Sequence, residues 1–201
     1  VWSDEHTGFY GKIFAQGGRQ GGDGGFVETS SKDNLQAWGA VDTLAARGQA
    51  GNWLLDPTEL YITTTSSNMD VTGGPAGPWT YAPPAGSAVA QSQANANTIL
   101  QALDAGQNVT IQVNTATGNS DTVGNIYISR PLVVASGVTT GDLTLLAGGA
   151  TGLYSAAGSP TTGAGVTPGG GGGGIFVNET IEIGGNLRLI AGNDPGITDP
   201  V

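Results

Sequence analysis

The amino-acid sequence predicts an all-β fold, a β-solenoid in which short strands stack along a narrow apolar core. Glycine supplies 36 of the 201 residues without the three-residue period of collagen, so the glycines mark turns between short strands. Runs of β-branched and aromatic residues recur between Gly, Asn, Asp and Pro, which favour turns. An alternating apolar pattern also repeats in the C-terminal half, as expected of stacked coils.

The predicted strands are short and rich in β-branched or aromatic residues, and turn-forming residues flank nearly all of them. They span residues 11–15, 25–29, 35–44, 52–55, 60–65, 108–113, 125–134, 143–147, 175–183 and 187–191.

The repeat is defined by apolar residues at alternate positions, which point to one face of a strand. Ile126, Ile128, Leu132 and Val134 match Ile175, Val177, Ile181 and Ile183 at an offset of 49, and Leu143 and Leu145 match Leu187 and Leu189 at an offset of 44. We expect these twelve side chains to face the core. The change of offset falls in a turn, where a solenoid tolerates insertions because its strand pattern is preserved.

Two segments divide the predicted coils, which occupy residues 1–72 and 107–201. Residues 73–93 form a Pro- and Gly-rich loop, because prolines are excluded from central strands. Residues 94–106 form a short helix with an apolar stripe and Gly106 as its C-cap. Within the second set of coils, residues 151–174 are a Gly-rich excursion that ends in six glycines.

Long outward turns are where a solenoid makes its contacts. Trp79, Tyr81 and Tyr154 lie in these two segments and are the candidate contact residues. A strip of aromatic side chains that stacks on sugars is one alternative; packing over a thin core is the other, and the sequence favours packing.

Charge and composition exclude several classes of protein. The formal net charge of −10 opposes binding to nucleic acid or to anionic lipid. No cysteine is present, which excludes disulfides and thiolate metal sites, and no apolar run is long enough to span a bilayer. We expect no cofactor. The first residues carry neither an initiator Met nor a signal-peptide pattern, so we expect a segment of a longer polypeptide.

No catalytic or metal-binding constellation stands out in the sequence. His6 is the single histidine and is expected to be a solvated side chain without triad partners. Asp23 lies in a Gly-rich turn and is expected to shape it, with a weak calcium site as the alternative. Glu179 and Glu182 are three apart on a strand and point to opposite faces, so they form no acid–base pair.

The N-terminal half resembles a known family in the order and spacing of its motifs. FYGKIFAQGG at residues 9–18 is followed by GGDGGFVETS at 21–30, GAVDT at 39–43 and GQAGNWLLDP at 48–57. This succession is similar to the filamentous-haemagglutinin-like exoproteins of two-partner secretion systems, in the segment after their secretion domain. The resemblance extends over about residues 1–113 and implies a right-handed parallel β-helix, export through a partner pore in the outer membrane, and a shaft without catalytic residues.

The sequence therefore predicts a secreted bacterial adhesin-like protein whose β-helical shaft projects or scaffolds contacts outside the cell, toward a host or neighbouring surface, a glycan or a biofilm matrix. A self-assembling extracellular filament or sheath subunit is the alternative, since open solenoid ends template stacking. A polysaccharide-active enzyme on the same fold is the third hypothesis, disfavoured because no charged cleft is indicated.

Overall fold

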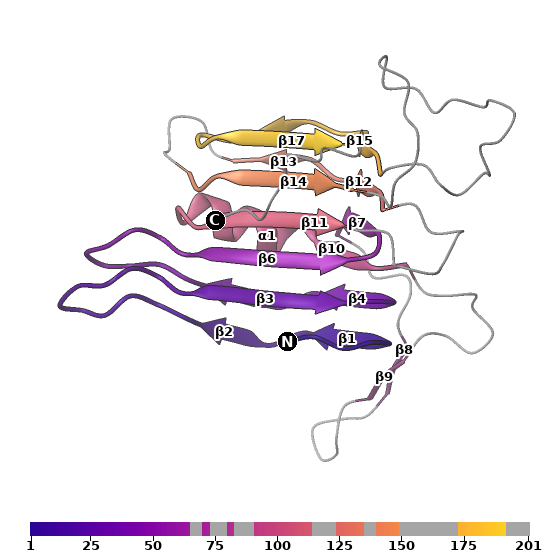
Figure 1. The fold of residues 1–201 in the computed structure, drawn as a ribbon, viewed down its shortest axis with the longest axis horizontal. Helices are drawn as coiled ribbons and strands as arrows, with labels where there is room; N and C mark the ends of the chain where they lie inside the picture. Colours follow the sequence, from indigo (N-terminus) through magenta and orange to yellow (C-terminus); the bar gives the residue numbers. More distant parts are fainter. Residues whose placement is uncertain are drawn as a thin grey trace, which may run out of the picture.

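The computed structural model describes residues 1–64, 91–113, 124–134, 140–148 and 173–191, together with the backbone of residues 70–72 and 80–82. Across these residues the protein is mostly β-structure with one short helix, and its main sheets are parallel (Figure 1). This confirms the predicted all-β class.

Two parallel sheets face each other across the core. The six-stranded sheet has the order β1 (His6–Phe9), β4 (Asn34–Ala37), β10 (Gln93–Asn95), β7 (Leu60–Thr63), β12 (Ile126–Ile128) and β15 (Ile175–Val177). The five-stranded sheet has the order β17 (Leu187–Ala191), β14 (Leu143–Ala147), β11 (Asn108–Val113), β6 (Asn52–Pro57) and β3 (Phe26–Ser31).

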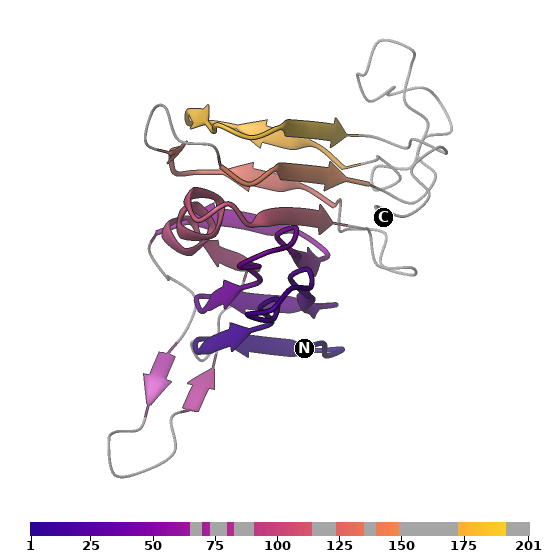
Figure 2. The same cartoon turned by 90° about the vertical axis from the view of Figure 1, so that its left-hand side faces the viewer.

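Three strand pairs complete the described β-structure. β2 (Lys12–Phe14) pairs in parallel with β5 (Ala40–Asp42), and β13 (Leu132–Val133) pairs in parallel with β16 (Ile181–Glu182). β8 (Asp70–Thr72) and β9 (Thr80–Ala82) form an antiparallel pair that projects from the stack (Figure 2). The prediction of a loop throughout residues 73–93 is therefore wrong at β9 and at Gln93, the first residue of β10.

The chain visits the sheets in the same order each time. It runs from the six-stranded sheet through a short strand into the five-stranded sheet, as β1–β2–β3, β4–β5–β6, β12–β13–β14 and β15–β16–β17. We call each such traverse a pass, and we extend the term to the section between β6 and β12, which also runs from the six-stranded sheet to β11 of the five-stranded sheet. The bend between β4 and β5, where Trp38 and Gly39 both donate to the carbonyl of Phe9, splits the single strand predicted at residues 35–44.

The middle of the stack departs from this order. β10 follows β7 in the sequence but lies between β4 and β7 in the sheet. Helix α1 (Ala96–Asp104) then replaces a short strand and packs against β5, β11 and β13. The helix starts later than predicted because residues 94 and 95 belong to β10, and the Asn95 side chain caps it by accepting from the Asn97 N–H at 2.9 Å. Ala105 is the C-cap, and Gly106 follows it with a φ of 90°, which glycine adopts readily.

The register of the last two passes confirms the repeat read from the sequence. Ile126 pairs with Ile175, Leu132 with Ile181, and Leu143 with Leu187. A parallel ladder in register places equivalent side chains directly above one another. Each apolar position of one pass therefore covers the same position of the previous pass.

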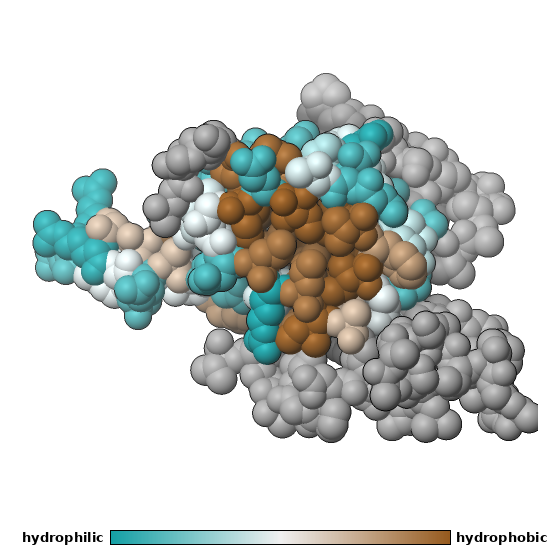
Figure 3. Space-filling model, turned by 90° about the horizontal axis from the view of Figure 1, so that it is seen from above, coloured by the Kyte–Doolittle hydropathy of each residue, from teal (hydrophilic) through white to brown (hydrophobic). Residues whose placement is uncertain are grey.

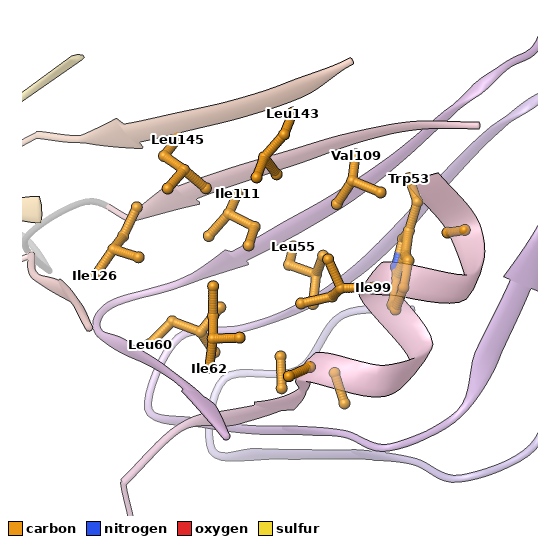
Figure 4. Packing of buried hydrophobic residues seen from close by; sticks show 14 of the residues in the cluster. Trp53, Leu55, Leu60, Ile62, Ile99, Val109, Ile111, Ile126, Leu143 and Leu145 are labelled. Atoms are coloured by element: carbon orange, nitrogen blue, oxygen red, sulfur yellow. The ribbon is translucent and has the colours of Figure 1, made fainter. Parts of the chain in front are cut away.

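The core is a column of aliphatic side chains that the passes enclose. The predicted core positions Ile126, Ile128, Leu132, Val134, Leu143 and Leu145 are all buried. Trp53 from β6 and Ile99 from α1 are fully buried beside them, and the helix fills the wider middle of the stack (Figure 4).

The last pass is the exception among the predicted core positions. Val177, Leu187 and Leu189 are exposed, and Ile175, Ile181 and Ile183 are only partly buried. Their register partners in the previous pass are buried, so these side chains point toward the core side of the strands, as predicted. They are not buried there, which differs from the prediction. Figure 3 shows the apolar surface that results at this end of the stack.

Substitution of the two equivalent positions Ile128 and Ile181 should separate buried from end positions. We expect Ile128→Asp to lower the free energy of unfolding by more than about 4 kcal/mol, because it places an unpaired charge in the closed core. Ile181→Asp should cost less than about 2 kcal/mol, since Ile181 keeps contact with solvent. Urea denaturation of the purified chain measures both values. Equal losses of stability would contradict the difference in burial between Ile128 and Ile181.

Glycine substitution should test the close approach of neighbouring passes. A Cβ on Gly141 would overlap the carbonyl of Gln107, whereas a Cβ on the exposed Gly11 would meet nothing within 4 Å. We expect Gly141→Ala to destabilise the fold by about 3 kcal/mol, because the backbones of two passes must separate. The control Gly11→Ala should stay within about 0.5 kcal/mol in the same denaturation experiment. A similar loss in both variants would contradict the close approach.

Candidate functional site

Three aromatic rings form a stack on the outer face of the six-stranded sheet. Tyr61 and Tyr127 lie 4.4 Å apart between ring centroids, and Tyr127 and Phe176 lie 4.8 Å apart, each pair within 11° of parallel. The three residues share one register position on β7, β12 and β15. Tyr61 and Tyr127 alternate with buried residues along their strands, so they point away from the core, and Phe176 follows them in register.

The stacked rings cover one another's faces. A sugar ring binds an aromatic side chain by lying on its face, so the faces that the three rings turn toward one another are closed to a sugar. Trp53 offers no open face because it is fully buried and donates from Nε1 to Thr29 Oγ1 at 2.9 Å. The geometry therefore favours the packing interpretation of these aromatics. A stacked pair contributes about 0.5–1.5 kcal/mol beyond area burial.

Phe176 is a member of this stack that sequence reasoning missed. The signal that identifies it is the offset of 49, which aligns Phe176 with Tyr127 in the two copies of the repeat.

Polar side chains form a second ladder where the chain enters the five-stranded sheet. The Asn108 side-chain oxygen accepts from the Asp142 N–H at 3.0 Å, and Asp142 Oδ1 accepts from the Asn186 N–H at 2.7 Å. Both carboxylate oxygens of Asp142 also accept from Asn186 Nδ2 at 3.1 Å. Each side chain thus satisfies a backbone donor of the next pass, which a bend leaves without a ladder partner.

Other bends use the same device. Thr140 Oγ1 accepts from the N–H groups of Gly184 and Gly185 at 2.8 Å. Asp23 Oδ1 accepts from the Gln49 N–H at 2.8 Å and so links its own turn to a bend of the neighbouring pass. These polar residues hold neighbouring passes in register.

His6 is not the solvated side chain that the sequence suggested. It is partly buried, and its Nδ1 lies 2.9 Å from the side-chain oxygen of Asn34. That oxygen also accepts from Gln36 Nε2 at 3.2 Å, so Nδ1 is the donor in its bond. Nε2 is buried without a hydrogen-bond partner. Among the described residues, the hydrogen-bond partner of His6 is therefore the neutral side-chain amide of Asn34.

The carboxylates with perturbed protonation lie on β6 and just after it. Burial, and secondarily the charge of Glu28, raises the pKa of Asp56 to about 6. Burial also raises the pKa of Glu59, while a hydrogen bond with Tyr61 opposes that rise. The pKa of Tyr61 is raised by burial and by the charge of Glu59. The described part of the chain holds no group of three or more acidic or histidine side chains that could bind a metal ion.

Glu179 and Glu182 are two further carboxylates whose positions the structure describes. Both are exposed, on the last pass. Arg130 is equivalent to Glu179 in the repeat, and its Nε donates to Thr64 Oγ1 at 3.1 Å.

The predicted contact residues cannot be placed. Trp79, Tyr154 and the side chain of Tyr81 lie outside the described residues, as do residues 151–172 of the Gly-rich excursion. The contact role of these residues stays a prediction.

Comparison with known proteins adds no relative, since no family model and no curated protein matches this chain. In the part of the chain that is described, α1 is neither long nor apolar enough to cross a membrane, and no other helix is present there.

The raised pKa of Asp56 predicts a dependence of stability on pH. The folded state favours the neutral form of the Asp56 carboxyl group. The resulting contribution to the free energy of unfolding is complete below pH 3.8 and is lost as the pH rises through about 6. We expect Asp56→Asn to gain stability relative to the native chain by roughly 1–2 kcal/mol between pH 4 and 7, a value reduced for the partial exposure of the carboxyl group. Urea denaturation at a series of pH values measures this difference.

Glu28→Gln provides the matched control for that experiment. It removes the neighbouring charge but keeps Asp56 titratable, so the pH dependence should persist and shift to lower pH. If the free energies of unfolding of Asp56→Asn and the native chain differed by the same amount at all pH values, the raised pKa of Asp56 would be contradicted.

Proposed function

We propose that the chain is a stretch of a right-handed parallel β-helix that serves as the rigid shaft of a secreted bacterial surface protein. The observation that carries this proposal is the repeated order of sheets with parallel pairing in register from β12 to β15 and from β14 to β17. A chain that returns to each sheet after each pass winds around one axis. Every further pass then lengthens the stack by about 4.8 Å.

The proposed shaft gains stiffness from interactions that run along its axis. Backbone hydrogen bonds connect each pass to the next on two sides of the core. The ring stack at Tyr127 and the polar ladder at Asp142 cross the same junctions on the outer surface. Bending the shaft must break several of these interactions together, so a stack of this kind holds distant parts of a protein apart.

Secretion and adhesion form part of the proposal through the family resemblance. The motifs at residues 9–57 favour export by a partner pore, with the shaft presenting outward loops to a host surface, a neighbouring cell or a glycan. The family resemblance implies a shaft without catalytic residues, so the proposal assigns a structural role to the chain. The formal net charge of −10 keeps such a shaft soluble and away from anionic lipid.

Immunogold electron microscopy of the protein from its source organism tests this function. Antibodies against residues 1–64 should label the outside of intact cells or material in the culture medium. The labelled polypeptide should have an intact mass far above the 20.0 kDa of this chain and form single thin rods. Label confined to the cell interior, or compact particles, would contradict the proposal. Antibodies preabsorbed with the purified chain provide the control.

A further inference from the structure

Tyr61 on β7 and Tyr127 on β12 are two phenols that the fold holds face to face. Their ring centroids lie 4.4 Å apart, with an angle of 11° between the ring planes. The two residues are register partners in a parallel ladder, so both side chains leave the sheet in the same direction. Because the rings are stacked and the hydroxyl groups also share a hydrogen bond, the ring carbons next to these hydroxyls lie near one another.

The neighbours of this pair in the same column are not phenols. Phe176 stacks on Tyr127 from the other side, at 4.8 Å between ring centroids. Gln93 of β10 is the register partner of Tyr61 on the side away from Tyr127. A phenol gives up an electron and a proton far more readily than a phenyl ring or an amide. Within this column, an oxidised Tyr127 therefore meets one phenol, that of Tyr61.

Glu59 lies where it can take the proton that oxidation of Tyr61 releases. The Tyr61 hydroxyl donates a hydrogen bond to the Glu59 carboxylate. Burial raises the pKa of Glu59, which makes its carboxylate a better proton acceptor. Both tyrosines are partly buried, so they keep some contact with solvent through which an oxidant can act and the proton of Tyr127 can leave.

We propose that Tyr61 and Tyr127 form a site of oxidative cross-linking, at which hydrogen peroxide and a peroxidase join the two rings as dityrosine. Each phenol gives up one electron and one proton, and the two phenoxyl radicals form a bond between the ring carbons next to their oxygens. The hydrogens on those two carbons then move to the oxygens and restore both phenols. The chain loses two hydrogen atoms in total, and these reduce one hydrogen peroxide to two molecules of water.

The cross-link joins neighbouring strands of the six-stranded sheet by a covalent bond. It lies beside the backbone hydrogen bonds between β7 and β12, which break and reform, whereas the bond between the rings is permanent. The bond also closes the chain between residues 61 and 127 into a loop and restricts the unfolded state, so the oxidised chain should melt at a higher temperature. This inference adds a covalent reinforcement to the proposed shaft, and it rests on the pairing of β7 with β12, not on secretion or adhesion.

Treatment of the dilute, folded chain with hydrogen peroxide and a haem peroxidase tests the proposal. Cleavage of the denatured product before each aspartate places the five tyrosines of the sequence in five different peptides. Mass spectrometry of chains that stay monomeric on a denaturing gel should find peptides 56–69 and 121–141, which carry Tyr61 and Tyr127, joined with the loss of two hydrogens. We expect at least about tenfold more of this pair than of any other, because the fold holds these two phenols together.

Three single variants identify the groups that react. Tyr127→Phe keeps a ring in the stack but should abolish the joined peptide, because a phenyl ring forms no phenoxyl radical. Tyr10→Phe is the matched control, since Tyr10 lies between β1 and β2, outside the stack, and the cross-link should form as in the native chain. Glu59→Gln should slow cross-linking by about tenfold, because the neutral amide does not accept the proton of Tyr61. An unchanged rate in that variant would overturn the role of Glu59.

The cross-linking site is rejected if oxidation joins other tyrosines while peptides 56–69 and 121–141 stay separate, or joins these two only between chains. An equal yield from the chain unfolded in urea would also reject it, because the fold would then not direct the coupling. Circular dichroism of each protein before oxidation shows whether it is folded. A folded chain that is not joined leaves the shaft proposal intact, and a chain that is joined but never exported contradicts the proposed function alone.

Discussion

The parallel ladder between successive passes is the interaction on which the other features of this molecule depend. β12 and β14 each pair with a strand of the previous pass along one edge and with a strand of the following pass along the other. A shift in the register of one pair would therefore displace the side chains of every later pass. Differences in length must therefore fall in the bends. The close contact of Gly141 with the Gln107 carbonyl shows how little space the ladder leaves there.

The ladder also determines which residues can cooperate. Side chains at one register position lie about 4.8 Å apart, which is the spacing of stacked rings and of an amide above a carboxylate. Tyr127 and Phe176 use this spacing on the outside, and Asp142 and Asn186 use it at a bend. The same geometry spreads titratable groups along the stack, which suits a mechanical role better than a concentrated catalytic one.

One helix interrupts the strands around the core. Short parallel strands enclose the core, and Trp53 is the largest of its fully buried side chains. Trp53 lies beside helix α1, from which Ile99 and Leu103 are also fully buried. At the last pass, by contrast, Val177, Leu187 and Leu189 are exposed.

The sequence by itself determined the strand-rich class, the apolar face of each strand and the alignment of the last two passes at offsets of 49 and 44. These features are local, because alternation within a strand decides which side chains share a face. Only the tertiary structure decided that β10 lies between β4 and β7, that His6 is partly buried, and that Leu187 is exposed. The pairing partners and the burial of a strand depend on which other segments of the chain lie beside it. The alternation of apolar and polar residues within one strand does not specify those segments.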